Sequence, residues 1–106
     1  MKSDLELVAA VKSGDVKAFS ELVLRHQKAV LRLSLRWVKD VDLAEDIVQD
    51  SFIKAYQKIH LFEERSSFKS WLFRIAMNTA NNKLRSESGY TVDVERVHMI
   101  VAPEAE

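Results

Sequence analysis

The sequence predicts an all-α domain, a compact bundle of about four helices. The chain of 106 residues contains only two glycines and one proline, so it has few residues that end strands or form tight turns. Apolar residues recur in successive stretches at the spacing of one helix face. This length allows one domain with a core of ordinary size and leaves no room for a second independent core.

The first two helices are predicted from their capping residues. Ser3 or Asp4 can cap a short first helix, and Gly14 can end it, because glycine tolerates the backbone conformation found just after a helix. Asp15 can then cap a longer second helix that reaches about Val38. The expected core positions of this second helix are Ala18, Phe19, Leu22, Val23, Val30, Leu33, Leu35 and Trp37.

A third helix is predicted after a polar turn at residues 39–42. Asp42 followed by Glu45 matches a capping box, and the helical pattern then continues to about Ile59. Its expected core residues are Ala44, Ile47, Val48, Phe52, Ala55, Tyr56 and Ile59. The other face carries acidic and amide groups around one isoleucine: Glu45, Asp46, Gln49, Asp50, Ile53 and Gln57. That face is either a solvated surface or a docking surface for a basic partner helix.

The fourth helix, residues 66–85, carries two different faces, and Ser66 or Ser67 can cap it. One stripe is apolar and predicts the core side: Phe68, Trp71, Leu72, Ile75, Ala76, Ala80 and Leu84. The opposite stripe is Ser70, Phe73, Arg74, Met77, Asn78, Asn81, Asn82 and Arg85. Each asparagine in a helix interior costs about 0.5 kcal/mol relative to alanine. This cost favours a role for the second stripe beyond folding.

Positive charge gathers on the fourth helix, although the whole chain has no net charge. Residues 1–64 hold ten basic and eleven acidic side chains, residues 65–86 hold five basic and none acidic, and residues 87–106 hold one basic and five acidic. A basic cluster is typical of a nucleic-acid footprint, although a solvated face has the same composition. In the preceding loop, Phe62 either packs beneath the chain or offers a ring for base stacking.

Composition excludes several classes of function. The absence of cysteine excludes disulfides and thiolate metal sites, and His26, His60 and His98 lack the spacing of metal ligands. We expect no metal, no cofactor and no catalytic residues, because no nucleophile and base are placed together, so the protein is not expected to be an enzyme. No apolar run is long enough to cross a membrane and no secretion signal begins the chain. We therefore expect a cytoplasmic protein without membrane insertion.

The sequence divides into a helical domain at residues 1–86 and an interdomain linker or tail at residues 87–106. Residues 91–101 begin with an alternating pattern that would also suit a strand or an extended partner-binding segment. The sequence offers no second strand with which it could pair, which favours the linker.

Two long motifs resemble region 2 of bacterial sigma factors of the extracytoplasmic-function (ECF) group. Within residues 42–58 the chain reads Glu-Asp-Ile-Val-Gln-Asp-Ser-Phe-Ile-Lys-Ala-Tyr, and residues 67–80 read Ser-Phe-Lys-Ser-Trp-Leu-Phe-Arg-Ile-Ala-Met-Asn-Thr-Ala. Residues 14–23 and 25–27 resemble the opening of the same domain. The resemblance extends over about residues 4–86.

The resemblance implies a transcription initiation factor domain that binds core RNA polymerase and recognises and melts the promoter −10 element by holding bases of the single-stranded non-template strand. It implies that a coiled coil of the largest catalytic polymerase subunit contacts Asp46, Gln49, Asp50 and Ile53. It also implies a capture loop at residues 60–68. The implied DNA-binding residues are Phe62, Arg65, Lys69, Phe73, Arg74, Met77, Asn78, Asn81, Asn82, Lys83 and Arg85. Such side chains can pair with base edges, stack on bases or meet phosphates.

One part of the family pattern has no counterpart in the sequence. Sigma factors of this group also carry region 4, a helix-turn-helix domain that reads the promoter −35 element, and no such pattern follows Arg85. The chain is therefore either a fragment or a single-domain relative. An anti-sigma factor is a further candidate partner. The alternative function is a sigma-like interaction module that binds this regulatory partner and does not bind DNA.

Overall fold

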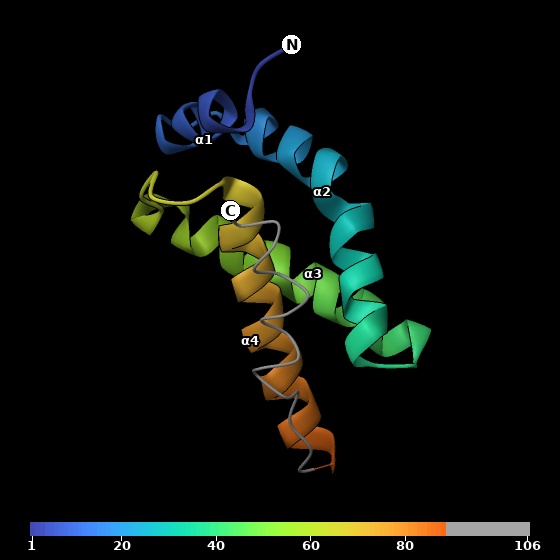
Figure 1. The fold of residues 1–106 in the computed structure, drawn as a ribbon. Coiled ribbons are helices and arrows are strands. Elements are labelled where there is room, and N and C mark those ends of the chain that lie inside the picture. Colours follow the sequence, from blue (N-terminus) through green and yellow to red (C-terminus); the bar gives the residue numbers. More distant parts are fainter. Residues whose placement is uncertain (89–106) are drawn as a thin grey trace.

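A computed structural model describes residues 1–88, which form four α-helices and one 3-10 helix (Figure 1). In order they are α1 (Asp4–Lys12), α2 (Val16–Trp37), α3 (Val41–Lys58), η1 (Ile59–Leu61) and α4 (Phe68–Ser88). α2 and α3 pack against each other, α4 packs against both, and α1 contacts α2 and η1. The predicted all-α bundle is confirmed. Residues 91–101, where the sequence left a strand or a linker open, lie outside the described residues.

The predicted caps of α1 and α2 are present. The Ser3 hydroxyl accepts a hydrogen bond from the Glu6 N–H at 3.2 Å, and the Glu6 carboxylate accepts one from the Ser3 N–H at 3.0 Å. This second bond is the main reason that the pKa of Glu6 is lowered below its usual value, and the Ser3 side chain adds to it. Gly14 follows α1 with a φ of 102°, and Asp15 caps α2 by accepting from the N–H groups of Lys17 and Ala18.

The predicted capping box at Asp42 is wrong, because α3 is capped by Asp40. The Asp40 carboxylate accepts hydrogen bonds from the N–H groups of Asp42 and Leu43, at 2.9 and 3.2 Å. The turn before α3 explains why Asp40, and not Asp42, is the cap. Val38 is extended and 5% exposed, so the chain reverses directly after a buried residue and reaches the start of α3 at Asp40. Asp42 instead lies in the first turn of the helix.

The core lies between α2, α3 and α4, and Leu7, Val8 and Val11 of α1 are also part of it. Its buried members include most of the predicted positions, namely Ala18, Leu22, Val30, Leu33, Ala44, Ile47, Phe52, Ala55, Ile59, Phe68, Leu72, Ala76 and Ala80. Tyr56, predicted as core, is instead 44% exposed and lies at the rim with its ring 5.0 Å from that of Phe19.

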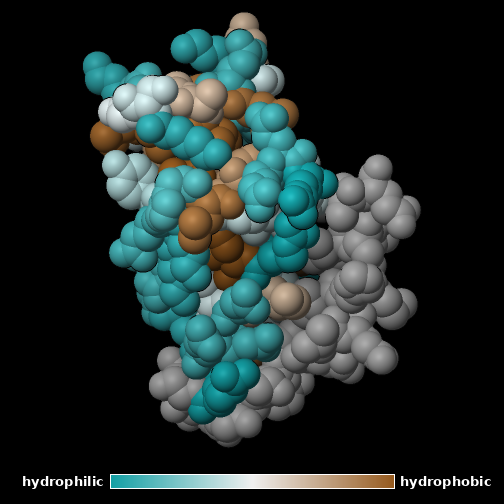
Figure 2. Space-filling model, turned by 90° about the vertical axis from the view of Figure 1, so that its left-hand side faces the viewer, coloured by the Kyte–Doolittle hydropathy of each residue, from teal (hydrophilic) through white to brown (hydrophobic). Residues whose placement is uncertain are grey.

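The surface of the described residues is mostly polar. Figure 2 shows one such face, where hydrophilic side chains cover most of the described surface and hydrophobic ones emerge between them. Among the helices of residues 1–88, none is long and apolar enough to cross a membrane.

Candidate nucleic-acid interface

The loop that leads into α4 is fixed to the body of the domain. Lys12, at the end of α1, donates a hydrogen bond from Nζ to the Phe62 carbonyl at 2.8 Å. The Phe62 ring is 2% exposed and lies 5.2 Å from the Trp71 ring and 6.1 Å from the Phe68 ring. Phe62 therefore packs beneath the loop, and the expectation that its ring is presented for base stacking is wrong. The edge-to-face contacts of the Phe62 ring with the Trp71 and Phe68 rings stabilise this buried position.

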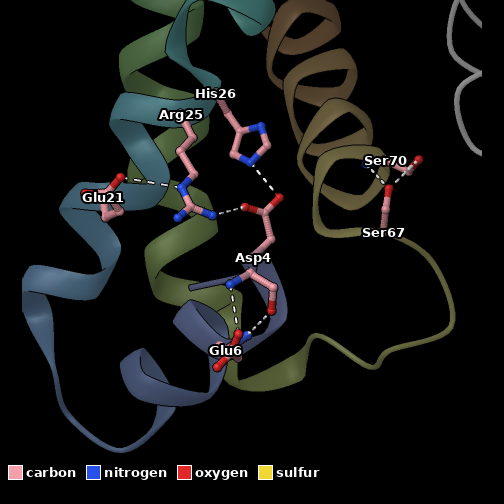
Figure 3. Close-up of polar contacts among 8 residues, drawn as sticks. Asp4, Glu6, Glu21, Arg25, His26, Ser67 and Ser70 are labelled. Atoms are coloured by element: carbon pink, nitrogen blue, oxygen red, sulfur yellow. Dashed lines mark hydrogen bonds and ion pairs between the residues drawn. The ribbon is translucent and has the colours of Figure 1, made fainter. Parts of the chain in front are cut away.

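A polar cluster joins α1 to α2 beside the start of α4 (Figure 3). The Asp4 carboxylate pairs with His26 Nε2 at 2.8 Å and with Arg25 Nη1 at 3.2 Å. Arg25 also pairs with Glu21 at 3.4 Å, and the His26 ring lies 5.5 Å from the ring of Phe68. The first residue of α4 is thus held against side chains that α1 and α2 position.

Ser67 caps α4 and is hydrogen-bonded to Ser70 in the first turn of that helix. The Ser67 hydroxyl accepts a hydrogen bond from the Ser70 N–H at 3.1 Å and donates one to the Ser70 hydroxyl at 3.0 Å (Figure 3). The neighbouring Ser66 hydroxyl accepts one from Arg74 Nη2 at 3.0 Å. The loop therefore supports Arg74, one of the predicted DNA-binding residues.

One stripe of α4 faces solvent. Its exposed members are Arg74, Asn78, Asn82 and Arg85, which we call the amide stripe. They recur at helical spacing, so their side chains line one side of the helix. Met77 and Asn81 are half-buried beside it, whereas Lys69 and Lys83 are half-buried on the side of α4 that carries Ala76 and Ala80. The structure thus brings most of the predicted DNA-binding residues of α4 together on or beside one surface.

Phe73 and Ser70 do not belong to that surface. Phe73 is 4% exposed and Ser70 is 2% exposed, so the expectation that they lie on the open side of α4 is wrong. The physical reason is that α4 packs against both α2 and α3, which buries more of its circumference than one stripe. Lys69 Nζ lies 5.5 Å from the centre of the Phe73 ring and helps to cover it.

Arg65, predicted as a DNA contact in the loop, is accessible. Its side chain is 86% exposed and forms an ion pair with Glu63 at 3.4 Å. Both partners stand in solvent, so water and salt screen their attraction and the pair is weak. Arg65 can therefore exchange this partner for another anion at little cost.

The predicted docking residues lie on α3. Asp46, Gln49 and Ile53 are exposed, with Ile53 at 55%, and Asp50 is half-exposed; we call these four residues the docking face. Asp50 Oδ2 also pairs with Lys83 Nζ of α4 at 2.7 Å. The structure therefore joins two residues that were predicted to serve two different partners.

Two residues of the docking face, Asp46 and Gln49, also line a groove of about 570 Å³ between α2 and α3. The groove is lined by Gln27, Lys28, Leu31, Asp42, Glu45, Asp46, Val48 and Gln49. The α2 wall was not predicted from the sequence. The signal for it was Leu31, an apolar residue of α2 that the predicted core positions leave out and that lines the groove. Among the described residues, no group of three or more His, Asp or Glu side chains is arranged to hold a metal ion.

Comparisons with a family model and with curated proteins agree on one family, the sigma factors. A family model described as Sigma-70 region 2 matches residues 22–90. The chain is 46% identical over 83 residues to the RNA polymerase sigma-H factor of Pseudomonas aeruginosa, covering 78% of this chain and 43% of that protein. It is 48% identical over 85 residues to the ECF RNA polymerase sigma-E factor of Haemophilus influenzae, covering 80% of this chain and 44% of that protein. The chain thus spans less than half the length of these curated relatives.

A solved structure is also similar. It is the NMR structure of an engineered region 2 of sigmaE in complex with GTAAAA. The two chains share 43% sequence identity with a TM-score of 0.74, over 82% of this chain and 95% of the other.

Proposed function

Because the chain belongs to the Sigma-70 region 2 family, we propose that it is a transcription initiation domain that binds core RNA polymerase and holds single-stranded DNA of the promoter −10 element. The amide stripe is the observation that carries the proposal, since it exposes Asn78 and Asn82 between two arginines. The sigmaE relative in complex with GTAAAA supports DNA as the ligand. We assign the function to residues 1–86, with residues 87–106 as a linker or tail, and propose that it operates in the cytoplasm without a catalytic step.

The proposed DNA contacts follow from the chemistry of the exposed groups. Asparagine amides can donate and accept hydrogen bonds together, which suits the edges of unpaired bases. Arginine can meet phosphates or stack on a base through its planar guanidinium. The proposed set is Arg65, Lys69, Arg74, Met77, Asn78, Asn81, Asn82, Lys83 and Arg85. Phe62 and Phe73 are left out, because a ring that is 2 or 4% exposed has no free face on which a base can stack.

The proposed polymerase contact uses the docking face. Ile53 gives an apolar centre, and Gln49 and Asp46 lie on the same side of α3, one and two turns before it. An apolar residue within an acidic and amide surface suits a partner helix that carries basic and apolar residues, because opposite charges steer the encounter and the apolar contact excludes water. We propose the coiled coil of the largest catalytic subunit as that partner.

The DNA assignment is tested with Asn78→Ala in a complex of the domain with core polymerase. We expect single-stranded −10 DNA to bind more weakly by about 1 to 3 kcal/mol, the usual worth of a paired hydrogen bond to a base. Gln57→Ala is the matched control, since Gln57 is an exposed amide on α3 that belongs to neither proposed site. Equal DNA affinities for the two variants would show that Asn78 does not hold DNA.

The polymerase assignment is tested by retention of core polymerase on the immobilised domain. Ile53→Ala is expected to reduce retention, because it removes the apolar centre of the docking face. Leu61→Ala is the control, since Leu61 is 64% exposed and lies on η1, outside that face. If both variants retain the same amount of polymerase, the docking face is assigned wrongly.

The alternative from the sequence is an interaction module that an anti-sigma factor binds and that does not hold DNA. The α2–α3 groove is the observation that favours it, because Leu31 and Val48 provide apolar lining beside acidic side chains. Stable binding of a regulatory partner, together with no DNA binding in the polymerase complex, would replace our proposal with this one.

A further inference from the structure

Residues 63–65, which we call the loop tip, project from the loop before α4, and all three are exposed. The contacts of the tip are internal: the Arg65 N–H donates to the Glu63 carbonyl at 2.7 Å, and their side chains form the weak ion pair. Among residues 1–88, no hydrogen bond or ion pair joins the tip to another part of the domain. At its far end the chain continues into Ser66, which accepts a hydrogen bond from Arg74 of α4. The position of the tip therefore depends on the residues that flank it.

Lys12 fixes the direction in which the chain enters the loop tip. The buried ring of Phe62 and the hydrogen bond from its N–H to the Ile59 carbonyl, at 3.0 Å, hold Phe62 itself. They do not fix the next peptide group, which can rotate about the ψ angle of Phe62. The hydrogen bond from Lys12 Nζ to the Phe62 carbonyl, at 2.8 Å, holds this peptide group, and ψ is 124°. Because the tip follows directly, the orientation of that peptide group sets where the tip lies.

The helix that carries Lys12 is itself held firmly. At its first residue, Asp4 pairs with His26 and Arg25 of α2 (Figure 3). Lys12 is its last residue, so α1 extends from the polar cluster on α2 to the loop. Between these two ends, three residues of α1 are buried in the core: Leu7, Val8 and Val11. α1 contains none of the proposed DNA contacts, but it connects one of their supporting segments to the body of the domain.

We propose that Lys12 is a positioning residue for DNA binding, which orders the loop tip by holding the Phe62 carbonyl and so presents Arg65 to the bound strand. A contact that is ordered before binding does not lose that conformational freedom when the ligand arrives. Lys12 acts through the loop and needs no contact of its own with DNA. The inference rests on the proposed function, because it needs Arg65 to contact the strand.

The first test measures binding of the whole chain to a labelled single-stranded oligonucleotide that contains GTAAAA. Lys12→Met should bind about three- to tenfold more weakly than the wild type, because the strand must then order the tip. Lys17→Met is the control for the lost charge, since Lys17 is an exposed lysine on α2 outside both proposed sites. Lys12→Arg keeps a charged donor and should restore most of the affinity.

The second test asks whether Lys12 acts through the loop tip. In an Arg65→Gln background, Lys12→Met should weaken DNA binding no more than Lys17→Met does, because the contact that Lys12 positions is already lost. A general loss of stability would weaken binding in both backgrounds alike. In the free chain, the NMR order parameters of the Glu64 and Arg65 amides should fall in Lys12→Met, whereas those of Leu72 and Ala76 in α4 should stay unchanged.

The outcomes separate the inference from the proposed function. If the wild type binds the oligonucleotide and Lys12→Met binds it as tightly as Lys17→Met, the inference is overturned and the proposed function stands. The same holds if Lys12→Arg binds no better than Lys12→Met, or if the loss persists in full in the Arg65→Gln background. If the wild type binds no oligonucleotide, either alone or with polymerase, the proposed function fails and the inference fails with it.

Discussion

Replacing Phe62 by alanine should destabilise the whole domain, because the ring fills a buried site beneath the loop. Phe62 is 2% exposed, and its ring lies within 5.2 Å of the Trp71 ring and 6.1 Å of the Phe68 ring. Removing a buried phenylalanine ring costs about 3 to 5 kcal/mol, from lost burial and the cavity left behind. A domain of this kind is stable by about 5 to 15 kcal/mol, so the loss is a large fraction of the total.

Urea denaturation followed by circular dichroism measures this loss, and the neighbouring residue provides the control. Leu61 is 64% exposed, so Leu61→Ala should change the free energy of unfolding by no more than about 0.5 kcal/mol. In thermal denaturation, each kcal/mol corresponds to about 4 to 8 °C for a domain of this size. Similar unfolding energies for the two variants would refute the placement of Phe62 in the core and reopen a role for its ring in base stacking.

Three further predictions concern the helix ends. Asp40→Ala should lower the free energy of unfolding by about 1 kcal/mol by removing the α3 cap, and Asp42→Ala should lower it less; equal losses in urea denaturation would contradict Asp40 as the cap. Gly14→Ala should cost about 1 to 2 kcal/mol in the same assay, because a φ of 102° is unfavourable for alanine although its Cβ would meet no atom within 4 Å; an unchanged stability would argue against this backbone conformation. Hydrogen bonds from Ser3 lower the pKa of Glu6 in the folded domain. The Glu6 carboxylate therefore stabilises the fold at pH values above the pKa that Glu6 has in the unfolded chain. This stabilisation is lost as the pH falls through the pKa of Glu6 in the folded domain. In an NMR titration, Ser3→Ala should raise the Glu6 midpoint, and an unmoved midpoint would exclude the Ser3 side chain as a cause.

The helices and the family could be predicted from the sequence because both depend on patterns among residues that are close together in the chain. Apolar spacing fixes which residues can share a helix face, and Asp15 caps α2 through N–H groups only two and three residues away. The match to Sigma-70 region 2 confirms the predicted resemblance, which rested on two long continuous motifs. The α3 cap was misplaced because Asp40 and Asp42 both precede the same helical pattern, and the local sequence does not show at which residue the turn after Val38 ends.

The composition of the candidate site depended on packing between distant segments. Phe73 was assigned to the open stripe, although helical spacing puts it on the same face as Ala76, Ala80 and Leu84. The two helices that pack against α4 bury this side as well, so Phe73 is 4% exposed. The sequence left Phe62 open between core and surface, and the position of α1 decides this, since Lys12 holds the loop. The contact between Asp50 and Lys83 joins α3 to α4, and no local pattern places those two side chains together.

An NMR titration of the isotope-labelled domain with the oligonucleotide GTAAAA tests the central claim most directly, because it reports where DNA lies. If the amide stripe holds the strand, the largest changes in backbone amide signals should occur around Arg74, Asn78 and Asn82. Signals of groove residues on the α2–α3 side, such as Gln27 and Glu45, should change little. The largest changes in the groove, or no saturable change anywhere in the domain, would contradict the assignment of DNA to α4.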